Sequence, residues 1–234
     1  MLVYGKNVAE RILKDENLEK KIKVIYTDSI FYEKNSNLFR KIANSKIKMA
    51  ENRKLDDLAK GVHQGIIIDM EEYQYTNLDE FLRKDNKSVI ILDHILDPHN
   101  LGAIIRTAVA ASFDAVIIPK DRQALVNATV VKTSVGAIYD IDVIAVTNIN
   151  RCIDQLKQHD YWIYGSSLDG VSYDTVDYDR KVALIIGNEE KGMSKLVKDN
   201  SDFLIRIPIS SKIDSLNASV AAGIMMFEVV RSRK

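Results

Sequence analysis

Cysteine is nearly absent from this chain of 234 residues, in which Cys152 is the only one. A single thiol excludes an intrachain disulfide and any metal site built from several cysteines. The four histidines lack paired spacings such as HExxH, so we expect no zinc site and chemistry without a metal. No stretch approaches the roughly 18 uninterrupted apolar residues that a membrane span needs. We therefore expect a cytoplasmic protein that does not enter a membrane.

An excess of either charge is also lacking, because 33 lysines and arginines balance 33 aspartates and glutamates. A binder of nucleic acid must then concentrate its positive charge locally. One segment does so, with Glu51 as the only acid among its basic residues, which are Lys34, Arg40, Lys41, Lys46, Lys48, Arg53 and Lys54. This pattern indicates either an RNA-contacting patch or a basic helix face turned to solvent.

The composition that remains, 46% hydrophobic and 28% charged, is typical of a globular protein with one large or two small domains. The first part of the chain predicts a small α/β domain over residues 1–72. Its expected elements are a helix near 8–13, a strand at 23–26, a helix around 33–44 and a strand that ends in GIIIDM. A polar linker with weak helical character at 78–82 is predicted over residues 73–87.

Residues 88–234 predict a larger α/β domain. Short apolar runs alternate there with helical patterns near 101–111, 149–158 and 215–230; the runs are VIIL, AVII, VIAV, YWIYG, VALII and FLIRI. Uniformly apolar strands separated by helices favour a mostly parallel sheet covered on both faces. A ligand should then bind outside the carboxyl ends of the strands, where the loops lie.

The first informative loop is DPHNLGAIIRTA, in which a turn precedes a helix expected to begin at Leu101. Asn100 is a candidate cap for that helix. Arg106 projects from its second turn. A guanidinium there is suited to a bidentate grip on a phosphate or carboxylate, although a surface salt bridge is an equal alternative.

The second loop, LIIGNEEKG, follows an apolar strand and begins at Gly187. A glycine directly after a strand indicates a tight turn or a close approach of backbone. The loop lacks the GxxxxGK[ST] pattern of a phosphate loop, and Glu189 and Glu190 would repel phosphates. Binding of nucleoside triphosphates is therefore not expected.

The third loop, IPISSKIDSLNASVAAGI, leads into a helix expected to begin near Ser215. Ser215 and Asn217 place a hydroxyl and an amide at its N-terminus, where they either bind a ligand or cap the helix. The helix is apolar over much of its circumference, so it is either fully buried or part of an interface. A homodimer through this helix is our hypothesis.

These three loops, in this order, closely resemble the signature motifs of the SpoU family of RNA ribose methyltransferases, also called the TrmH family, within the SPOUT superfamily. The first domain resembles the family's L30e-like substrate-binding extension, from VYGKNVAERIL through VHQGIIIDM. Together the resemblances span nearly the whole chain. They imply an α/β catalytic domain with a C-terminal trefoil knot, and a homodimer whose active site draws on both subunits.

The resemblance also implies a cofactor and site residues. S-adenosylmethionine is expected to contact Gly187, Ile207 and Leu216, with Ser166, Leu168 and Gly170 as weaker candidates. The polar positions that align with catalytic or essential residues are Arg106, Asn100, Glu189, Ser215 and Asn217. Family members often have one acidic residue followed by a small residue, whereas this chain has Glu189 followed by Glu190. The alignment favours Glu189 for the family's acidic position.

The activity implied is methyl transfer to a ribose 2′-hydroxyl of RNA, most often a guanosine of large-subunit ribosomal RNA. In the family, Arg106 would act as general base, but a guanidinium stays protonated and is a poor proton acceptor. We expect Arg106 to hold a phosphate instead, while solvent or a phosphate oxygen takes the proton. Transfer RNA as substrate and a non-catalytic RNA-binding dimer stay open. A Rossmann enzyme is disfavoured because no GxGxxG follows an expected strand.

Overall fold

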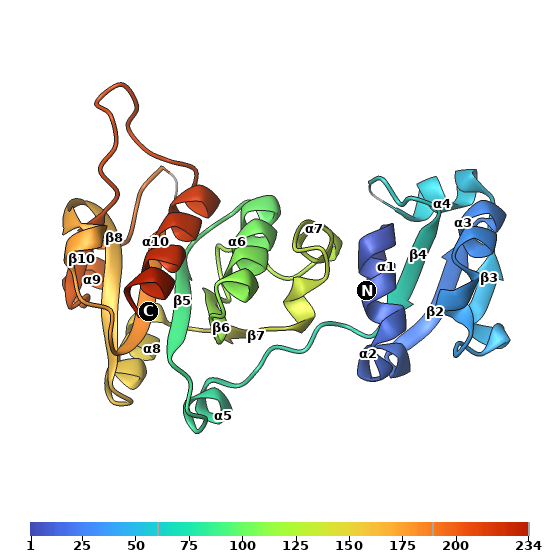
Figure 1. Cartoon of the computed structure of the whole chain (residues 1–234), viewed down its shortest axis with the longest axis horizontal. Helices are drawn as coiled ribbons and strands as arrows, with labels where there is room; N and C mark the ends of the chain where they lie inside the picture. The colour runs from blue at the N-terminus through green and yellow to red at the C-terminus, as the bar shows by residue number, and fades with distance from the viewer. Residues whose placement is uncertain (60, 189, 234) are drawn as a thin grey trace. The chain divides into compact units, whose positions relative to one another are not determined.

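The computed structural model describes residues 1–59, 61–188 and 190–233. The chain divides into two compact units (Figure 1). Unit 1 comprises residues 1–74 and 126–136, and unit 2 comprises 75–125 and 137–234. None of the described helices is both long enough and apolar enough to cross a bilayer.

Unit 1 is built on a four-stranded sheet in the order β1-β4-β2-β3. Strand β4 pairs antiparallel with both β1 and β2, whereas β2 and β3 run parallel. Three consecutive isoleucines of β4, Ile66, Ile67 and Ile68, are almost fully buried because both faces of this strand are covered. The elements are β1 (Leu2–Tyr4), α1 (Lys6–Lys14), α2 (Glu16–Lys20), β2 (Ile22–Thr27), α3 (Ser29–Lys34), η1 (Ser36–Phe39), η2 (Asn44–Lys46), β3 (Ile47–Met49), α4 (Asn52–Leu58), β4 (Ile66–Met70) and α7 (Ala128–Thr133).

The single helix expected around residues 33–44 was a wrong prediction. The chain forms the end of α3, the short 3₁₀ turns η1 and η2, and an intervening loop. Asn35 ends α3, because its side-chain amide donates to the Phe31 carbonyl and its backbone leaves the helical region. The basic segment is therefore spread over several elements, which excludes one basic helix face as its explanation.

Unit 2 is built on six strands in the order β10-β8-β9-β5-β6-β7. Every neighbouring pair is parallel, which confirms the predicted parallel sheet. The six apolar runs of the sequence are these strands: β5 (Ser88–Asp93), β6 (Ala115–Pro119), β7 (Asp142–Val146), β8 (Tyr161–Ser172), β9 (Lys181–Gly187) and β10 (Phe203–Arg206).

Helices cover both faces of the unit 2 sheet. One face packs against α5, α8 and α9 in a core that includes the buried Cys152. On the other face, α6 and α10 lie side by side (Figure 1). The helical elements of unit 2 are α5 (Leu78–Leu82), α6 (Pro98–Ala110), η3 (Ala137–Tyr139), α8 (Ile149–Lys157), η4 (Tyr173–Thr175), α9 (Lys195–Asp199) and α10 (Ala218–Ser232). The trefoil knot stays a prediction.

The stretch 73–87, expected as a linker, joins unit 2 from Tyr75 onward. Thr76 bonds to strand β7 through its backbone N–H and, at 2.7 Å, through its hydroxyl to Asp142. Phe81 of α5 is fully buried in the sheet's core. The expected domain boundaries stay a prediction.

Two helices begin elsewhere than expected. Helix α6 begins at Pro98, not Leu101, and its cap is Asp97, whose carboxylate accepts the His99 N–H at 2.8 Å. Proline suits this first helical position, because its missing N–H would have no partner there anyway. Asn100 is therefore not the cap. Helix α10 begins at Ala218, and Asn217 is its cap.

The end of α10 is anchored to the amino ends of the strands by Arg233. Its guanidinium donates to the Ser88 hydroxyl and to the carbonyls of Tyr178, Arg180 and Lys87. Burial lowers the pKa of this arginine.

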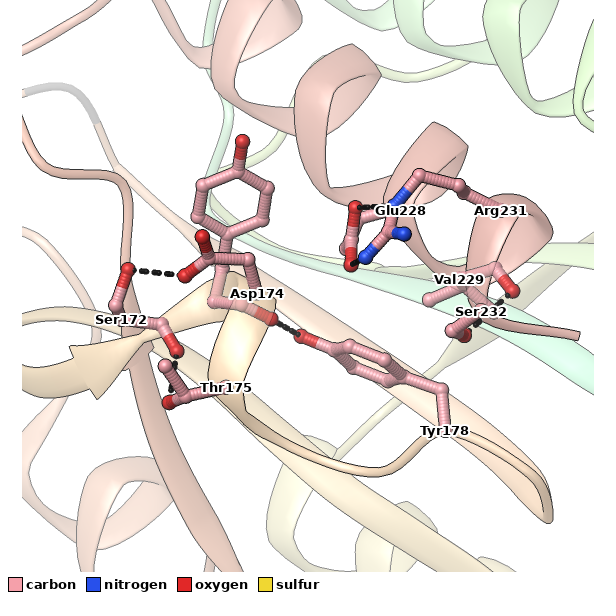
Figure 2. A network of polar contacts seen from close by, with 9 residues as sticks. Ser172, Asp174, Thr175, Tyr178, Glu228, Val229, Arg231 and Ser232 are labelled. Atoms are coloured by element: carbon pink, nitrogen blue, oxygen red, sulfur yellow. Dashed lines mark hydrogen bonds and ion pairs between the residues drawn. The ribbon is translucent and has the colours of Figure 1, made fainter.

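A polar network beside this anchor holds the segment that joins β8 to β9 (Figure 2). The Tyr178 hydroxyl donates to the Tyr173 carbonyl at 2.7 Å, and Thr175 donates to the Ser172 carbonyl. On α10, Arg231 forms a bidentate ion pair with the nearly buried Glu228. These bonds order the β8–β9 segment and the last turn of α10 each within itself, and the Arg233 hydrogen bonds join the two.

We expect Arg233→Ala to lower the free energy of unfolding by about 2–4 kcal/mol, because three carbonyls and one hydroxyl lose a charged donor. Urea denaturation followed by circular dichroism measures this. Arg151→Ala, at an exposed α8 position, is the control and should change stability by less than about 0.5 kcal/mol. Equal stability of the two variants would contradict the anchoring role.

Candidate functional site

A cleft of about 480 Å³ lies beside β8, β9 and β10 of unit 2, where β9 and β10 end. Three segments far apart in the sequence form it: part of β8, the loop after β9, and the loop between β10 and α10. Its lining mixes apolar side chains with backbone and a few charges; the charged residues are Asp169, Glu190, Lys191, Lys198, Arg206 and Asp214. Such a lining suits a nucleoside-sized ligand that carries charges of both signs.

The loop after β9 is held closed by backbone contacts. Asn188 and Gly192 exchange two backbone hydrogen bonds of 3.1 and 2.9 Å, and Gly192 has a φ of +64°. A Cβ at Gly187 would lie 2.4 Å from the backbone of Gly192 and Met193. The prediction of a close backbone approach at Gly187 is confirmed, and only glycine fits there.

Asp93 and His94 join this loop to the end of β5. Asp93 is 1% exposed; its carboxylate contacts His94 Nδ1 at 2.5 Å and accepts the Ser194 N–H at 2.8 Å. The Asn188 side chain donates to the His94 carbonyl at 2.9 Å. The sequence analysis assigned no role to these residues. An aspartate at the end of a wholly apolar strand could have indicated one, because a buried carboxylate needs hydrogen-bond partners.

The second wall of the cleft comes from residues 166–169 of β8. Pairing with β10 jumps from Gly165 to Val171, so this segment leaves the ladder. A Cβ at Gly170 would lie 2.5 Å from the backbone of β10, so this glycine packs against the strand and does not line the cleft. Ser166 and Leu168 do line it.

An ion pair joins this wall to α9 at the rim of the cleft. Lys198 of α9 and Asp169 lie 2.5 Å apart, and the hydrogen bond from Lys198 lowers the pKa of the Asp169 carboxyl. Both residues line the cleft. Because the pair is largely exposed, it orders the rim and adds little to stability.

The third wall is the loop before α10, where Ile207, Ser215 and Leu216 line the cleft. Asn217 caps α10 by accepting the N–H groups of Ser219 and Val220, so its capping role is confirmed. Its amide also donates to the Asn100 side chain at 3.0 Å. The N-terminal ends of α6 and α10 are thereby tied together beside the cleft.

Arg106 lies exposed on α6 and does not line the cleft. It forms no hydrogen bond or ion pair with residues 1–59, 61–188 or 190–233. Glu189, the expected acidic residue, lies outside the described residues. The functional roles expected for all these side chains stay predictions.

The fold and cleft define a class: a parallel α/β protein that binds a small ligand among loops at the sheet's carboxyl edge. The sequence profile of the SpoU rRNA Methylase family matches residues 87–227, and that of RNA 2′-O ribose methyltransferase substrate binding matches residues 2–76. The chain belongs to the SpoU family of RNA methyltransferases.

Named relatives agree with this membership. A protein of Staphylococcus epidermidis, named as a TrmH family tRNA/rRNA methyltransferase, is 43% identical over 100% of this chain and 96% of its own length. A relative of the same name from Staphylococcus aureus is 40% identical, covering 90% of this chain and 88% of its own.

Solved structures agree in fold. The SpoU methyltransferase AviRb of Streptomyces viridochromogenes, in complex with the cofactor AdoMet, superposes with a TM-score of 0.83 at 22% identity, covering 100% of this chain and 90% of that one. An AdoMet-bound rRNA methyltransferase of Sinorhizobium meliloti gives 0.82 at 24% identity, covering 98% and 86%. The predicted family and fold class are thus confirmed.

We expect Gly187→Ala to destabilise unit 2 by roughly 1–3 kcal/mol or more and to open the cleft, because the new methyl group would overlap fixed backbone. Gly223→Ala is the matched control. A Cβ at Gly223 meets only Thr107 at 3.6 Å, and alanine should stabilise α10 by up to about 1 kcal/mol. Chemical denaturation of both variants measures this, and an equally stable Gly187→Ala would contradict the close approach.

Proposed function

We propose that the cleft binds S-adenosylmethionine and that the protein methylates a ribose 2′-hydroxyl of RNA. The observation that carries the proposal is the convergence of the second and third motif loops, together with part of β8, on one cleft. The first motif loop is tied to the third by the Asn100–Asn217 hydrogen bond. Gly187 lines the cleft, and its close packing against the backbone of Gly192 and Met193 fixes the loop that would hold a bound nucleoside. Apolar side chains such as Leu216 and Met193 suit an adenine ring, and the charges of both signs suit a zwitterionic amino acid group.

The cofactor, when bound, supplies a methyl group that is already electrophilic because it is attached to a sulfonium. The protein must then align the hydroxyl with that methyl group, and positioning alone supplies much of the acceleration. We assign alignment to Arg106, Asn100, Ser215 and Asn217. Arg106, exposed and free of partners in the described part of the chain, grips an RNA phosphate. The Asn100–Asn217 pair holds the loop that carries Ser215. To Glu189 we assign the fixing of a loop or of a partner's arginine.

RNA contacts are proposed for unit 1 as well. On its sheet, Tyr26 pairs with Lys48 across β2 and β3, and Lys54 of α4 also lies over the ring. The two ammonium nitrogens lie 5.9 and 5.7 Å from the ring centroid. An aromatic ring flanked by lysines can contact a base and neighbouring phosphates.

Large-subunit ribosomal RNA is the proposed substrate, with transfer RNA as the alternative.

Transfer of radiolabelled methyl from S-adenosylmethionine to total RNA, isolated from cells that lack this gene, tests the proposal. We expect label in large-subunit RNA with the wild type, resistance of the labelled linkage to alkali, and loss of label with Arg106→Ala. Arg106→Lys should also weaken transfer, because an ammonium cannot form the bidentate grip. Full activity of the lysine variant would contradict the assigned role. If the cofactor binds but no RNA is labelled, either the target is a ribosome assembly intermediate or the protein is a non-catalytic RNA-binding dimer.

We further propose that the protein is a homodimer through α10. Val220 and Phe227 are each 49% exposed and lie seven residues apart, on one side of the helix. Half-buried Ile224 lies between them. A partner helix that covers this stripe would remove it from water.

We expect light scattering to give twice the mass of the 26.5 kDa chain for the wild type. Replacing Val220 and Phe227 together by aspartate should shift the mass to that of one chain, because two carboxylates cannot be buried unpaired. Leu196→Asp is the control, since this equally apolar and more exposed side chain lies on α9. A dimer that survives the double substitution would contradict the interface.

A further inference from the structure

Residues 166–169, which form the second wall of the cleft, are a strap that is held at both ends. Neither neighbouring strand pairs with them, because the β9 ladder ends at Gly165 and the β10 ladder omits them. At the first end, a Cβ on Gly165 would lie 2.7 Å from side-chain atoms of Met193 and Ser201. At the other end, a Cβ on Gly170 would lie 2.5 Å from the backbone of β10. The two ends are therefore tightly packed, whereas no strand holds the residues between them.

One ion pair ties the middle of this strap to the rest of unit 2. Lys198 of α9 donates to the Asp169 carboxylate at 2.5 Å. Within the described part of the chain, the Ser166 and Ser167 hydroxyls have no hydrogen-bond partner. The Asp169 side chain is 77% exposed and the Lys198 side chain 31% exposed, so water and salt compete for the pair. Such a pair breaks and forms again readily.

The strap also presents an apolar side chain to the cleft. Leu168 lines the cleft, although it is 63% exposed. A nucleoside that covers this side chain would remove apolar surface from water, which favours a closed strap when the ligand is bound. Lys198 and Asp169 line the cleft as well, so the ion pair lies at the site itself.

We propose that the strap opens to admit and release S-adenosylmethionine, and that the ion pair between Lys198 and Asp169 is its latch. This inference rests on the proposed binding of that cofactor in the cleft. With the pair formed, the strap is closed, both in the free protein and over a bound nucleoside. With the pair broken, residues 166–169 move outward between their fixed ends. Because the pair holds the strap and not the ligand, it sets how fast the cofactor exchanges more than how tightly it binds.

Lys198→Ala tests the proposal through cofactor exchange. Association of tritiated S-adenosylmethionine is measured by rapid mixing, and its dissociation by dilution into unlabelled cofactor. Both rate constants should rise roughly 2–5-fold, the range for an exposed ion pair, while the calorimetric Kd stays within about twofold. Lys195→Ala is the matched control, because Lys195 is an exposed residue of the same helix that does not line the cleft. It should leave both rate constants unchanged.

Exchanging the two charges tests the pair itself. The double variant Asp169→Lys, Lys198→Asp should regain the wild-type rate constants, whereas either single reversal should exchange cofactor faster than the wild type. Sodium chloride should raise both rate constants of the wild type toward those of Lys198→Ala, and it should change that variant less, because salt screens only a pair that is present.

Two results would overturn the latch. Unchanged rate constants in Lys198→Ala would show that the pair does not hold the strap. A raised Kd with faster dissociation alone, which the double variant does not reverse, would show that Lys198 contacts the cofactor directly. A wild type that binds no S-adenosylmethionine overturns the proposed function itself, whereas a wild type that binds it as fast as Lys198→Ala does overturns only the latch.

Discussion

The buried carboxylate of Asp93 is the contact on which the site depends. A charge at the end of the central strand is costly to bury unless both oxygens are bonded, and here His94 and the Ser194 N–H satisfy them. Those bonds tie the end of β5 to the loop after β9, across neighbouring strands. The loop in turn forms one wall of the cleft, so the position of this wall depends on the buried Asp93 carboxylate.

Close backbone packing supplies the second constraint. Gly187 and Gly170 each bring two stretches of main chain closer than any Cβ would allow. The first closes the loop after β9, and the second holds β8 against β10 where residues 166–170 leave the ladder. Both contacts join main chain to main chain, so the two walls of the cleft that they hold have little freedom to move at these points. Such preorganisation is what positional catalysis requires.

Helix ends were the least predictable part of the fold. The sequence DPHN contains three residue types that begin helices, and proline at the first helical position settles the start in favour of the Asp97 cap. Because Asn100 is not the cap, its side chain can accept a hydrogen bond from Asn217, which lies more than a hundred residues later in the sequence. Likewise, Asn35 breaks a segment whose apolar spacing favoured one helix, because its amide binds the backbone locally.

The sequence by itself determined the six strands of unit 2, their parallel arrangement with both sheet faces covered, and the loops that line the cleft. Apolar runs indicate buried strands, and glycines indicate close approach of backbone. The family motifs added Gly187, Ile207, Leu216 and Ser215, all of which line one cleft. Only the tertiary structure paired Asp93 with His94 in reach of Asn188 and joined Asn100 to Asn217. These contacts depend on which strand ends lie side by side, and strand order comes from packing of the whole chain, which no local pattern encodes.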